Sequence, residues 1–284
     1  MVLPRIITSI IFVPVVVALV WVGTIPFFIF VSGLSLLCVW EYSLIADQGG
    51  YPNQLYMALF GTALLLLALF FDGVPWGPLH KTPSVISVFI FWSFLVFVRE
   101  FIRRDKSLAY LRIITTLSGV LIGALFLGHL LLIRDLKAVA GEGFRYVGRE
   151  MTFFLIVVIW TVDTGAWCVG RLIGRHKLAP LVSPKKTWEG VVGGTLLACL
   201  VGWFFRAAFL RQEMGNVEAI LFTLVIAVSA QFSDLIESLM KRSFGVKDSS
   251  QLLPGHGGVL DRFDSFIFAA PFFYYVLIAT GRFI

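Results

Sequence analysis

Long apolar runs recur along the whole 284-residue sequence, and they constrain its fold more than any other feature. A helix needs about 20 mostly apolar residues to cross a hydrocarbon core of about 30 Å. Lipid offers no partner to a backbone amide or carbonyl, so a spanning segment must be a helix or a strand of a closed barrel. The runs are continuous rather than alternating, which favours helices. We therefore expect an all-α, polytopic integral membrane protein.

Nine of these runs are predicted to be transmembrane helices. They cover residues 6–22, 26–45, 55–71, 84–98, 112–133, 151–170, 190–208, 217–240 and 264–281. The composition agrees, because 58% of the residues are hydrophobic and only 14% are charged. So few charges could not cover the surface of a water-soluble domain.

The basic residues predict the orientation. With nine crossings, most of the 23 Lys and Arg residues fall on the side that holds the N-terminus. Cytoplasmic loops collect Lys and Arg, so this side is expected to face the cytoplasm. The net charge of +6 is explained by this bias and by attraction to anionic lipid, and it does not call for a nucleic-acid partner.

Charge is distributed unevenly between the two parts of the chain. Residues 1–150 have almost no charge inside their apolar runs, whereas residues 151–284 carry acids and bases in or beside several. We therefore expect residues 1–150 to form a transmembrane scaffold, with room for a homodimer interface. Residues 151–284 are expected to form the catalytic transmembrane domain.

The eighth run ends in "SAQFSDLIESLMKRSFG", and its polar residues share one face of a helix. This face, an arc of about 140° at helical spacing, holds Gln231, Asp234, Glu237, Ser238, Lys241 and Arg242. A carboxylate that faces lipid costs about 3 kcal/mol, so the polar face should line a cavity or the protein interior. The alternative is an interfacial helix end whose two bases simply reach water.

The sixth run carries Asp163, which needs a cation or hydrogen-bond donors as partners at membrane depth. Ala166, Gly170 and Gly174 follow at every fourth position, a spacing that allows close contact between helices.

A basic segment, "HKLAPLVSPKKTWEG", precedes the seventh run. It places hydroxyl and ammonium donors just before a helix N-terminus, the combination that binds phosphate. The donors are Ser183, Lys185, Lys186 and Thr187. A basic cytoplasmic loop without a binding role is the alternative interpretation.

The segment "KDSSQLLPGHGGVLDRFDS" contains a turn followed by an acidic helix start. Gly257 and Gly258 permit positive φ and the close approach of a ligand to the backbone. Asp261 and Asp264 then lie at i and i+3 on the ninth helix. With Asp234 they form a set of hard oxygen ligands that suits Mg²⁺.

Bases surround these acids in the sequence. They are Lys241, Arg242, Lys247 and Arg262. Carboxylates and bases around a glycine turn indicate a metal-bound polyphosphate, as in phosphoryl or nucleotidyl transfer. Charges that only pair with one another in a solvated loop are the alternative, although pairing alone has no use for the glycine turn.

This pattern resembles the signature of the phosphatidate cytidylyltransferase family, also called CDP-diacylglycerol synthase. The matching elements are Ser238, Lys241-Arg242, Lys247-Asp248, His256-Gly257-Gly258 and Asp261-Arg262-Phe263-Asp264. "DTGAW", "HKLAPLVSPKKTWEG" and "SDLIES" also look like family segments, so the resemblance covers about residues 155–284.

The resemblance implies the transfer of CMP from CTP to phosphatidate at the cytoplasmic face of a bacterial inner membrane. It implies Mg²⁺ held by Asp234 and Asp261, with K⁺ as a second cation. Asp248, Asp264 and Glu237 are further candidate metal ligands, and Asp163 is a candidate substrate contact. His256 either donates to a phosphate oxygen or fixes the loop.

Two other functions fit parts of the sequence. A lipid or polyprenol kinase would also use Mg²⁺ and a nucleotide, but its alcohol nucleophile would need a base. An ion-coupled transporter would use the intramembrane carboxylates to carry ions.

Overall fold

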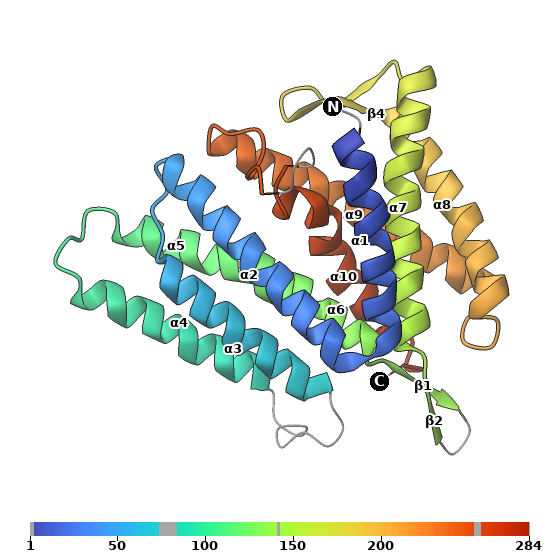
Figure 1. Ribbon diagram of the computed structural model, residues 1–284, viewed down its shortest axis with the longest axis horizontal. Helices are drawn as coiled ribbons and strands as arrows, with labels where there is room; N and C mark the ends of the chain where they lie inside the picture. Colours follow the sequence, from blue (N-terminus) through green and yellow to red (C-terminus); the bar gives the residue numbers. More distant parts are fainter. Residues whose placement is uncertain (1–2, 74–83, 141–142, 253–256, 284) are drawn as a thin grey trace. The chain divides into compact units, whose positions relative to one another are not determined.

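A computed structural model describes residues 3–73, 84–140, 143–252 and 257–283, without the side chains of residues 3–11, 73, 84 and 140. Its helices dominate the fold (Figure 1). They are α1 (Leu3–Val22), α2 (Thr24–Gln48), α3 (Leu55–Gly73), α4 (Ser84–Ile102), α5 (Ala109–Val120), the π-helix η1 (Leu121–Phe126), α6 (Leu127–Arg134), α7 (Gly148–Ile173), α8 (Trp188–Phe209), α9 (Asn216–Ser243) and α10 (Leu260–Ala279).

The predicted spans agree with these helices. Because α5, η1 and α6 run without a break from Ala109 to Arg134, the described chain has nine helical segments. Eight of them are long and apolar enough to cross a membrane. The first predicted span corresponds to α1, whose described side chains begin at Phe12 and form an apolar helix to Val22. The expectation of a polytopic, helical membrane protein is confirmed.

Two short β-hairpins were not predicted. In one, β1 (Lys137–Ala140) pairs with β2 (Gly143–Tyr146); in the other, β3 (Lys177–Ala179) pairs with β4 (Ser183–Thr187). The second hairpin tolerates Pro184 because its ladder is irregular between the Lys177 and Ala179 pairs, and a strand without an outer neighbour can lack an amide donor.

The chain forms two compact units. Unit 1 comprises Met1–Leu132 and Lys241–Phe263, and unit 2 comprises Ile133–Met240 and Asp264–Ile284. The end of α9 and the start of α10 therefore belong to unit 1, with the N-terminal helices.

Unit 1 has a core of buried apolar side chains from α2, α3, α4, α5 and η1, which includes Trp92. The indole Nε1 of Trp92 donates to Met57 O at 2.8 Å, which satisfies its polar atom. A Cβ on Gly61 would lie 2.2 Å from the Trp92 ring, so only glycine fits there. Glu100 and Arg112, each 3% exposed, form an ion pair with a 2.5 Å contact in this unit.

Unit 2 is organised around α7 and α8, which lie side by side (Figure 1). A Cβ on Gly194 would lie 2.6 Å from Val162 O, and one on Gly190 would lie 2.7 Å from Ala166 O. Backbones this close need small residues at the interface. The prediction of close helix contact is confirmed for Ala166 and Gly170, whose Cα would lie 3.3 Å from a Cβ on Gly190, whereas Gly174 follows the end of α7 and its missing Cβ leaves room for Thr187.

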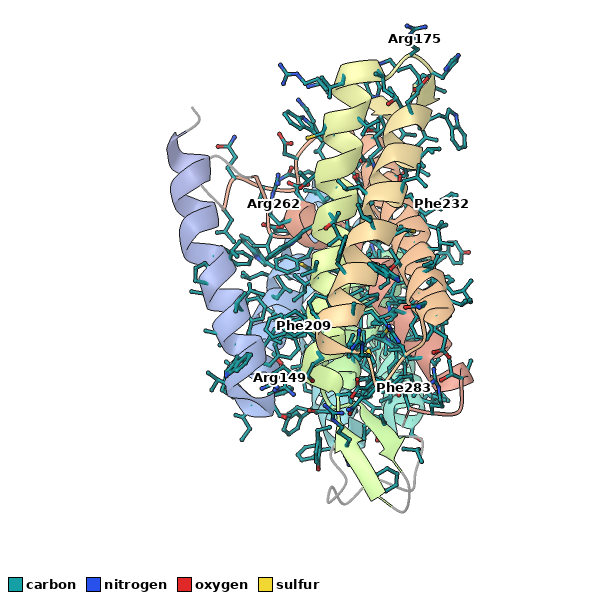
Figure 2. All side chains as sticks on the ribbon, turned by 90° about the vertical axis from the view of Figure 1, so that its right-hand side faces the viewer. Arg149, Arg175, Phe209, Phe232, Arg262 and Phe283 are labelled. Atoms are coloured by element: carbon teal, nitrogen blue, oxygen red, sulfur yellow. The ribbon has the colours of Figure 1, made fainter. Side chains whose placement is uncertain are left out.

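The ends of unit 2 show that its helices alternate in direction. At one end, Val139 N donates to Arg282 O at 2.9 Å, and Arg145 pairs with Glu213 at 2.6 Å. The hairpin β1–β2 therefore lies beside the C-terminus. The hairpin β3–β4 lies at the other end, where Figure 2 shows Arg175, with Arg149 and Phe283 at the opposite end.

Candidate active site

Asp261 is the centre of the polar cluster in unit 1. Its Oδ1 accepts from Lys241 Nζ at 2.6 Å, and its Oδ2 accepts from Ser249 N at 3.0 Å and Gly258 N at 2.9 Å. The side chains of Lys241 and Asp261 are 11% and 7% exposed. A buried ion pair with added hydrogen bonds of this kind holds both side chains in one geometry.

Glycine is favoured at the two signature positions 257 and 258 for different structural reasons. Gly257 has φ +83°, a conformation that favours glycine. A Cβ on Gly258 would lie 1.8 Å from Ser249 Oγ and 2.6 Å from Glu41 Oε2. The space beside the Gly258 Cα, which the sequence suggested for a phosphate, is therefore filled by the protein's own Ser249 and Glu41.

The other signature residues of unit 1 lie on the surface. Arg242, Lys247, Asp248 and Arg262 are exposed. Arg242 Nη1 donates to Val246 O at 3.2 Å, across the turn that follows α9. His256 lies outside the described residues, so its two candidate roles stay predictions.

In unit 2, Asp234 forms an ion pair with a lysine, as Asp261 does in unit 1. Its Oδ2 lies 2.6 Å from Lys186 Nζ, and both side chains are about a quarter exposed, at 28% and 25%. Ser238 Oγ donates to Asp234 Oδ1 at 3.4 Å, one turn along α9. The structure thus brings Lys186 of β4 together with Asp234 of α9, two residues that the sequence placed in separate motifs.

Three more carboxylates surround this pair in unit 2. Asp264 interacts electrostatically with Asp163, Asp234 and Glu237, all of the same sign. Glu237 is buried, Asp264 is half-buried, and Asp163 is exposed and accepts a 3.5 Å hydrogen bond from Ser265 Oγ. The polar face predicted for the eighth run therefore does meet other polar residues within its unit.

The donor chemistry of these carboxylates fits a divalent cation. Four acids lie near one another in unit 2, and Lys186 is the base that acts electrostatically on Asp163 and pairs with Asp234. Hard carboxylate oxygens with excess negative charge suit Mg²⁺. Within the described ranges, however, no three His, Cys, Asp or Glu side chains are arranged to hold a metal ion. The four carboxylates of unit 2 thus have the chemistry of a Mg²⁺ site, but in this structure they are not arranged around one point.

The predicted phosphate donors of the hairpin β3–β4 differ in how far they are exposed. Lys185 is exposed and Ser183 is half-buried in β4, whereas Thr187 is buried and accepts from Gly190 N at 3.2 Å as the N-cap of α8. Thr187 Oγ1 is thus already engaged by the helix that it caps. Glu189 in the first turn of α8 accepts from Arg175 N and His176 N, which ties the hairpin to the helix.

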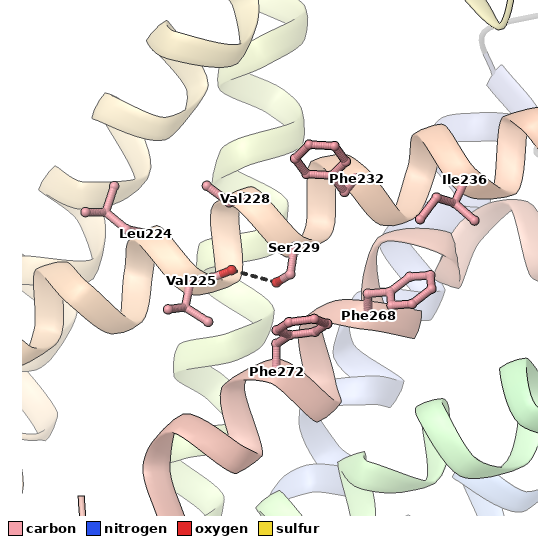
Figure 3. A pocket seen from close by; sticks show the side chains of 8 residues that line it. All are labelled: Leu224, Val225, Val228, Ser229, Phe232, Ile236, Phe268 and Phe272. Carbon is pink, nitrogen blue, oxygen red and sulfur yellow. Dashed lines mark hydrogen bonds between the residues drawn. The ribbon is translucent and has the colours of Figure 1, made fainter. Parts of the chain in front are cut away.

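An apolar cavity of about 540 Å³ lies along α9 in unit 2 (Figure 3). It is lined by Leu224, Val225, Val228, Ser229, Phe232 and Ile236 of α9 and by Phe268 and Phe272 of α10. The Ser229 hydroxyl donates to Val225 O at 2.6 Å and offers no free donor to a ligand. The cavity therefore suits a hydrocarbon chain.

Sequence reasoning missed Glu41 in α2. This side chain is 0% exposed and contacts the signature segment at Ser249, Ser250, Val259 and Leu260. A lone carboxylate within the run at 26–45 was the available signal, because membrane-depth acids are costly without partners.

The fold and these clusters define a polytopic membrane protein whose spanning helices carry acid–base pairs. The chain belongs to the cytidylyltransferase family, which matches residues 3–280.

Three relatives illustrate the similarity, each named phosphatidate cytidylyltransferase. The protein of Bacillus subtilis (strain 168) is 33% identical over 278 residues, 96% of either chain. That of Staphylococcus epidermidis is 47% identical over 139 residues, 49% of this chain and 51% of the relative. That of Staphylococcus saprophyticus is 44% identical over 147 residues, 50% and 56% of the two chains. The chain thus spans about half the length of the staphylococcal relatives that it matches.

Proposed function

We propose that this protein transfers CMP from CTP to phosphatidate and so forms CDP-diacylglycerol and pyrophosphate. The observation that carries the proposal is the ion pair between two signature residues, Lys241 and the largely buried Asp261, at 2.6 Å. The similarity over 96% of the chain to a phosphatidate cytidylyltransferase of Bacillus subtilis supports the same reaction.

The nucleophile in this reaction needs little activation. A phosphate monoester has a second pKa of about 6 and is largely dianionic at neutral pH. One of its oxygens forms a bond to the α-phosphorus of CTP, and the bond from that phosphorus to the β-phosphate bridging oxygen breaks, which releases pyrophosphate. The protein must chiefly overcome repulsion between the two anions.

The basic side chains would supply the opposing charge. The exposed bases Arg242, Lys247 and Arg262 can reach a ligand without leaving a buried partner. Lys186 can turn from Asp234 to a phosphate oxygen, and Ser183, Lys185 and Ser238 add further donors. Gly257, Gly258 and Thr187 shape the segments that present these donors, and His256 stays a candidate either to donate to a phosphate oxygen or to fix the loop.

Mg²⁺ is the proposed cofactor, and when bound it would neutralise the triphosphate and orient its α-phosphate. Asp234 and Asp261 are the proposed ligands, with Asp264, Glu237 and Asp248 as further candidates and Asp163 toward substrate. If Asp261 coordinated the ion, it would lose one of the hydrogen bonds that it accepts from Lys241 Nζ and Ser249 N. K⁺ is proposed as a second cation.

The apolar cavity along α9 is the proposed place for an acyl chain of phosphatidate. It ends at Ile236, two residues beyond Asp234 on the same helix. The lipid headgroup near Asp234 and Lys186 and its hydrocarbon chain along α9 would suit the polar and apolar faces of one helix.

The membrane placement is also proposed. The Lys and Arg bias favours a cytoplasmic location for β3–β4 and for the signature segment, the side on which CTP is found. Residues 1–150 serve as scaffold and residues 151–284 carry most of the site. A homodimer through residues 1–150 is a proposal that cross-linking in native membranes would test.

A labelling experiment tests the reaction. Purified protein is incubated with phosphatidate and with CTP labelled at the α- or the γ-phosphate, with and without Mg²⁺. We expect α-label in the lipid, γ-label in pyrophosphate, and no transfer without the metal. γ-Label in the lipid would identify a lipid kinase instead. Absence of any turnover in detergent, together with gradient-driven ion flux in vesicles, would favour the transporter.

A further inference from the structure

Glu41 is a buried carboxylate whose partners all come from one distant segment. Oε1 accepts from Ser250 Oγ at 2.5 Å and Val259 N at 2.9 Å. Oε2 accepts from Ser249 Oγ at 3.0 Å and Leu260 N at 2.7 Å. The four donors lie more than 200 residues further along the chain, within residues 249–260. One side chain of α2 therefore holds both ends of this segment.

Two of these donors are amides at the N-terminus of α10. The first amides of a helix have no partner within the helix, and a negative charge near them is favoured by the helix dipole. Glu41 satisfies Val259 N and Leu260 N and so fixes where α10 begins. Asp261 is the next residue in the chain, so the position of its backbone follows directly from these two bonds.

Asp261 binds the same segment from its other side. Ser249 offers its amide to Asp261 and its hydroxyl to Glu41, and Gly258 N donates to Asp261 immediately before the amides held by Glu41. The missing Cβ at Gly258 leaves room for the Glu41 carboxylate. The two acids thus hold residues 249–250 and 258–260 in one arrangement, in which Asp261 also accepts from Lys241.

The charge of Glu41 is compensated by neutral donors. The four donors described above are hydroxyl or amide groups, and none of them is an ammonium or guanidinium group. An ordinary helix cap would need only a short local side chain. Glu41 instead extends from the distant helix α2 and is 0% exposed, so it ties the N-terminal helices of unit 1 to the segment that carries Asp261.

We propose that Glu41 is a positioning residue for the transfer reaction: it holds Ser249, Ser250 and the start of α10, and so orients Asp261 and Lys241. The proposal rests on the function proposed above. It assigns to the N-terminal helices a part in the chemistry, besides their role as scaffold.

The test uses Glu41→Gln in the full-length protein. The amide keeps the shape of the side chain but turns one acceptor into a donor that faces a backbone amide. We expect kcat to fall by about tenfold or more, the scale of one lost hydrogen bond to a charged group. The KM values for CTP and phosphatidate should stay within about threefold, because the Glu41 carboxylate is buried and accepts from protein donors.

Glu100→Gln is the matched control. Glu100 is a 3% exposed carboxylate of the same unit, and it accepts from Arg112 Nε at 2.5 Å and Gln54 Nε2 at 2.8 Å. Its loss should lower the Tm and leave kcat unchanged. A role of Glu41 in stability alone would give both variants the same pattern, a lower Tm with wild-type kcat below the transition, and that result would overturn the proposal.

Hydrogen–deuterium exchange gives a readout that does not depend on turnover. The amides of residues 258–260 should exchange faster in Glu41→Gln and at the wild-type rate in Glu100→Gln. Unchanged protection of these amides would contradict the proposal even if activity fell.

Two further variants keep the test decisive if Glu41→Gln does not fold. Ser249→Ala and Ser250→Ala each remove one hydroxyl that donates to Glu41, and each should lower kcat. In a double variant with any Glu41 substitution that folds, kcat should fall no further than in the Glu41 variant alone. Wild-type kcat in both would overturn the proposal. Failure of the proposed function would instead be seen in the wild-type protein, as an absence of α-label in the lipid.

Discussion

At the scale of single residues, the pair Lys186 and Asp234 links a hairpin to a spanning helix. Their contact of 2.6 Å is only partly shielded, with side chains 25% and 28% exposed, so its contribution to stability is small. A pair that costs little to open is suited to exchange one partner for a substrate phosphate.

Lys186→Ala is therefore expected to raise KM for CTP or phosphatidate by about tenfold, the loss of one charge-assisted hydrogen bond, with a smaller change in kcat. Steady-state kinetics on both substrates measure this. Lys177→Ala, an exposed lysine of the same hairpin, is the control and should behave as wild type. Unchanged KM for both substrates would remove Lys186 from the binding site.

Asp261→Ala is expected to abolish turnover while the protein stays inserted in the membrane. The substitution leaves the buried Lys241 without its acid and frees the amides of Ser249 and Gly258. Transfer of α-label over a range of Mg²⁺ concentrations measures the effect. Asp47→Ala removes an exposed acid of the same unit and should keep full activity. Near-wild-type turnover of Asp261→Ala would exclude Asp261 as a metal ligand.

At the scale of elements, the turn before α10 depends on a glycine without room for a side chain. Gly258→Ala would bring a methyl group within 1.8 Å of Ser249 Oγ. We expect a destabilisation of about 1–3 kcal/mol from overpacking and a loss of turnover of about tenfold or more as Asp261 shifts.

The control for this change is Gly33→Ala in α2, where a Cβ would meet nothing within 4 Å. That variant should be neutral or slightly stabilising, because alanine restricts the unfolded chain and favours helix. Thermal unfolding and label transfer are compared for both. Wild-type activity in Gly258→Ala would show that the segment tolerates rearrangement.

The cavity between α9 and α10 predicts a chain-length effect. Val225→Phe should narrow it and lower kcat/KM for long-chain phosphatidate about tenfold more than for a short-chain form, the scale of a few methylene contacts. Leu221→Phe, an exposed residue of α9 that does not line the cavity, is the control. An equal loss for both chain lengths would place the acyl chain elsewhere.

At the scale of the whole molecule, helices that cross the membrane in turn are expected to place successive loops on opposite sides of it. The hairpin β1–β2 follows one crossing after the loop at residues 103–108, and β3–β4 follows the next. The contacts of β1 with the C-terminus in unit 2 agree with this alternation. The positive-inside bias then predicts that β1–β2 faces away from the cytoplasm.

Single cysteines test this orientation after replacement of Cys38, Cys168 and Cys199. A maleimide that cannot cross membranes should label Phe144→Cys in intact cells, since Phe144 is exposed. It should label Ser107→Cys and Lys177→Cys only after permeabilisation. The opposite pattern would invert the membrane placement of the site.

Much of the architecture could be predicted because every segment that spans lipid must be apolar and must satisfy its own backbone hydrogen bonds. Eight apolar runs became long helices, and the polar face of α9 meets other polar residues in its unit. The two hairpins were missed because strands of three to five residues are too short to leave a periodic signal, and the second hairpin also contains prolines.

The sequence by itself determined the spanning helices and the residue types of the reactive segment, since both depend on local hydropathy and on a contiguous pattern. Only the tertiary structure decided the partners of the acids: Lys241 for Asp261, Lys186 for Asp234, and residues 249–260 for Glu41. The partners of Glu41 lie 208 to 219 positions away. A buried carboxylate must be satisfied by whichever donors the fold brings to it, and spacing in the sequence cannot specify a contact over that distance.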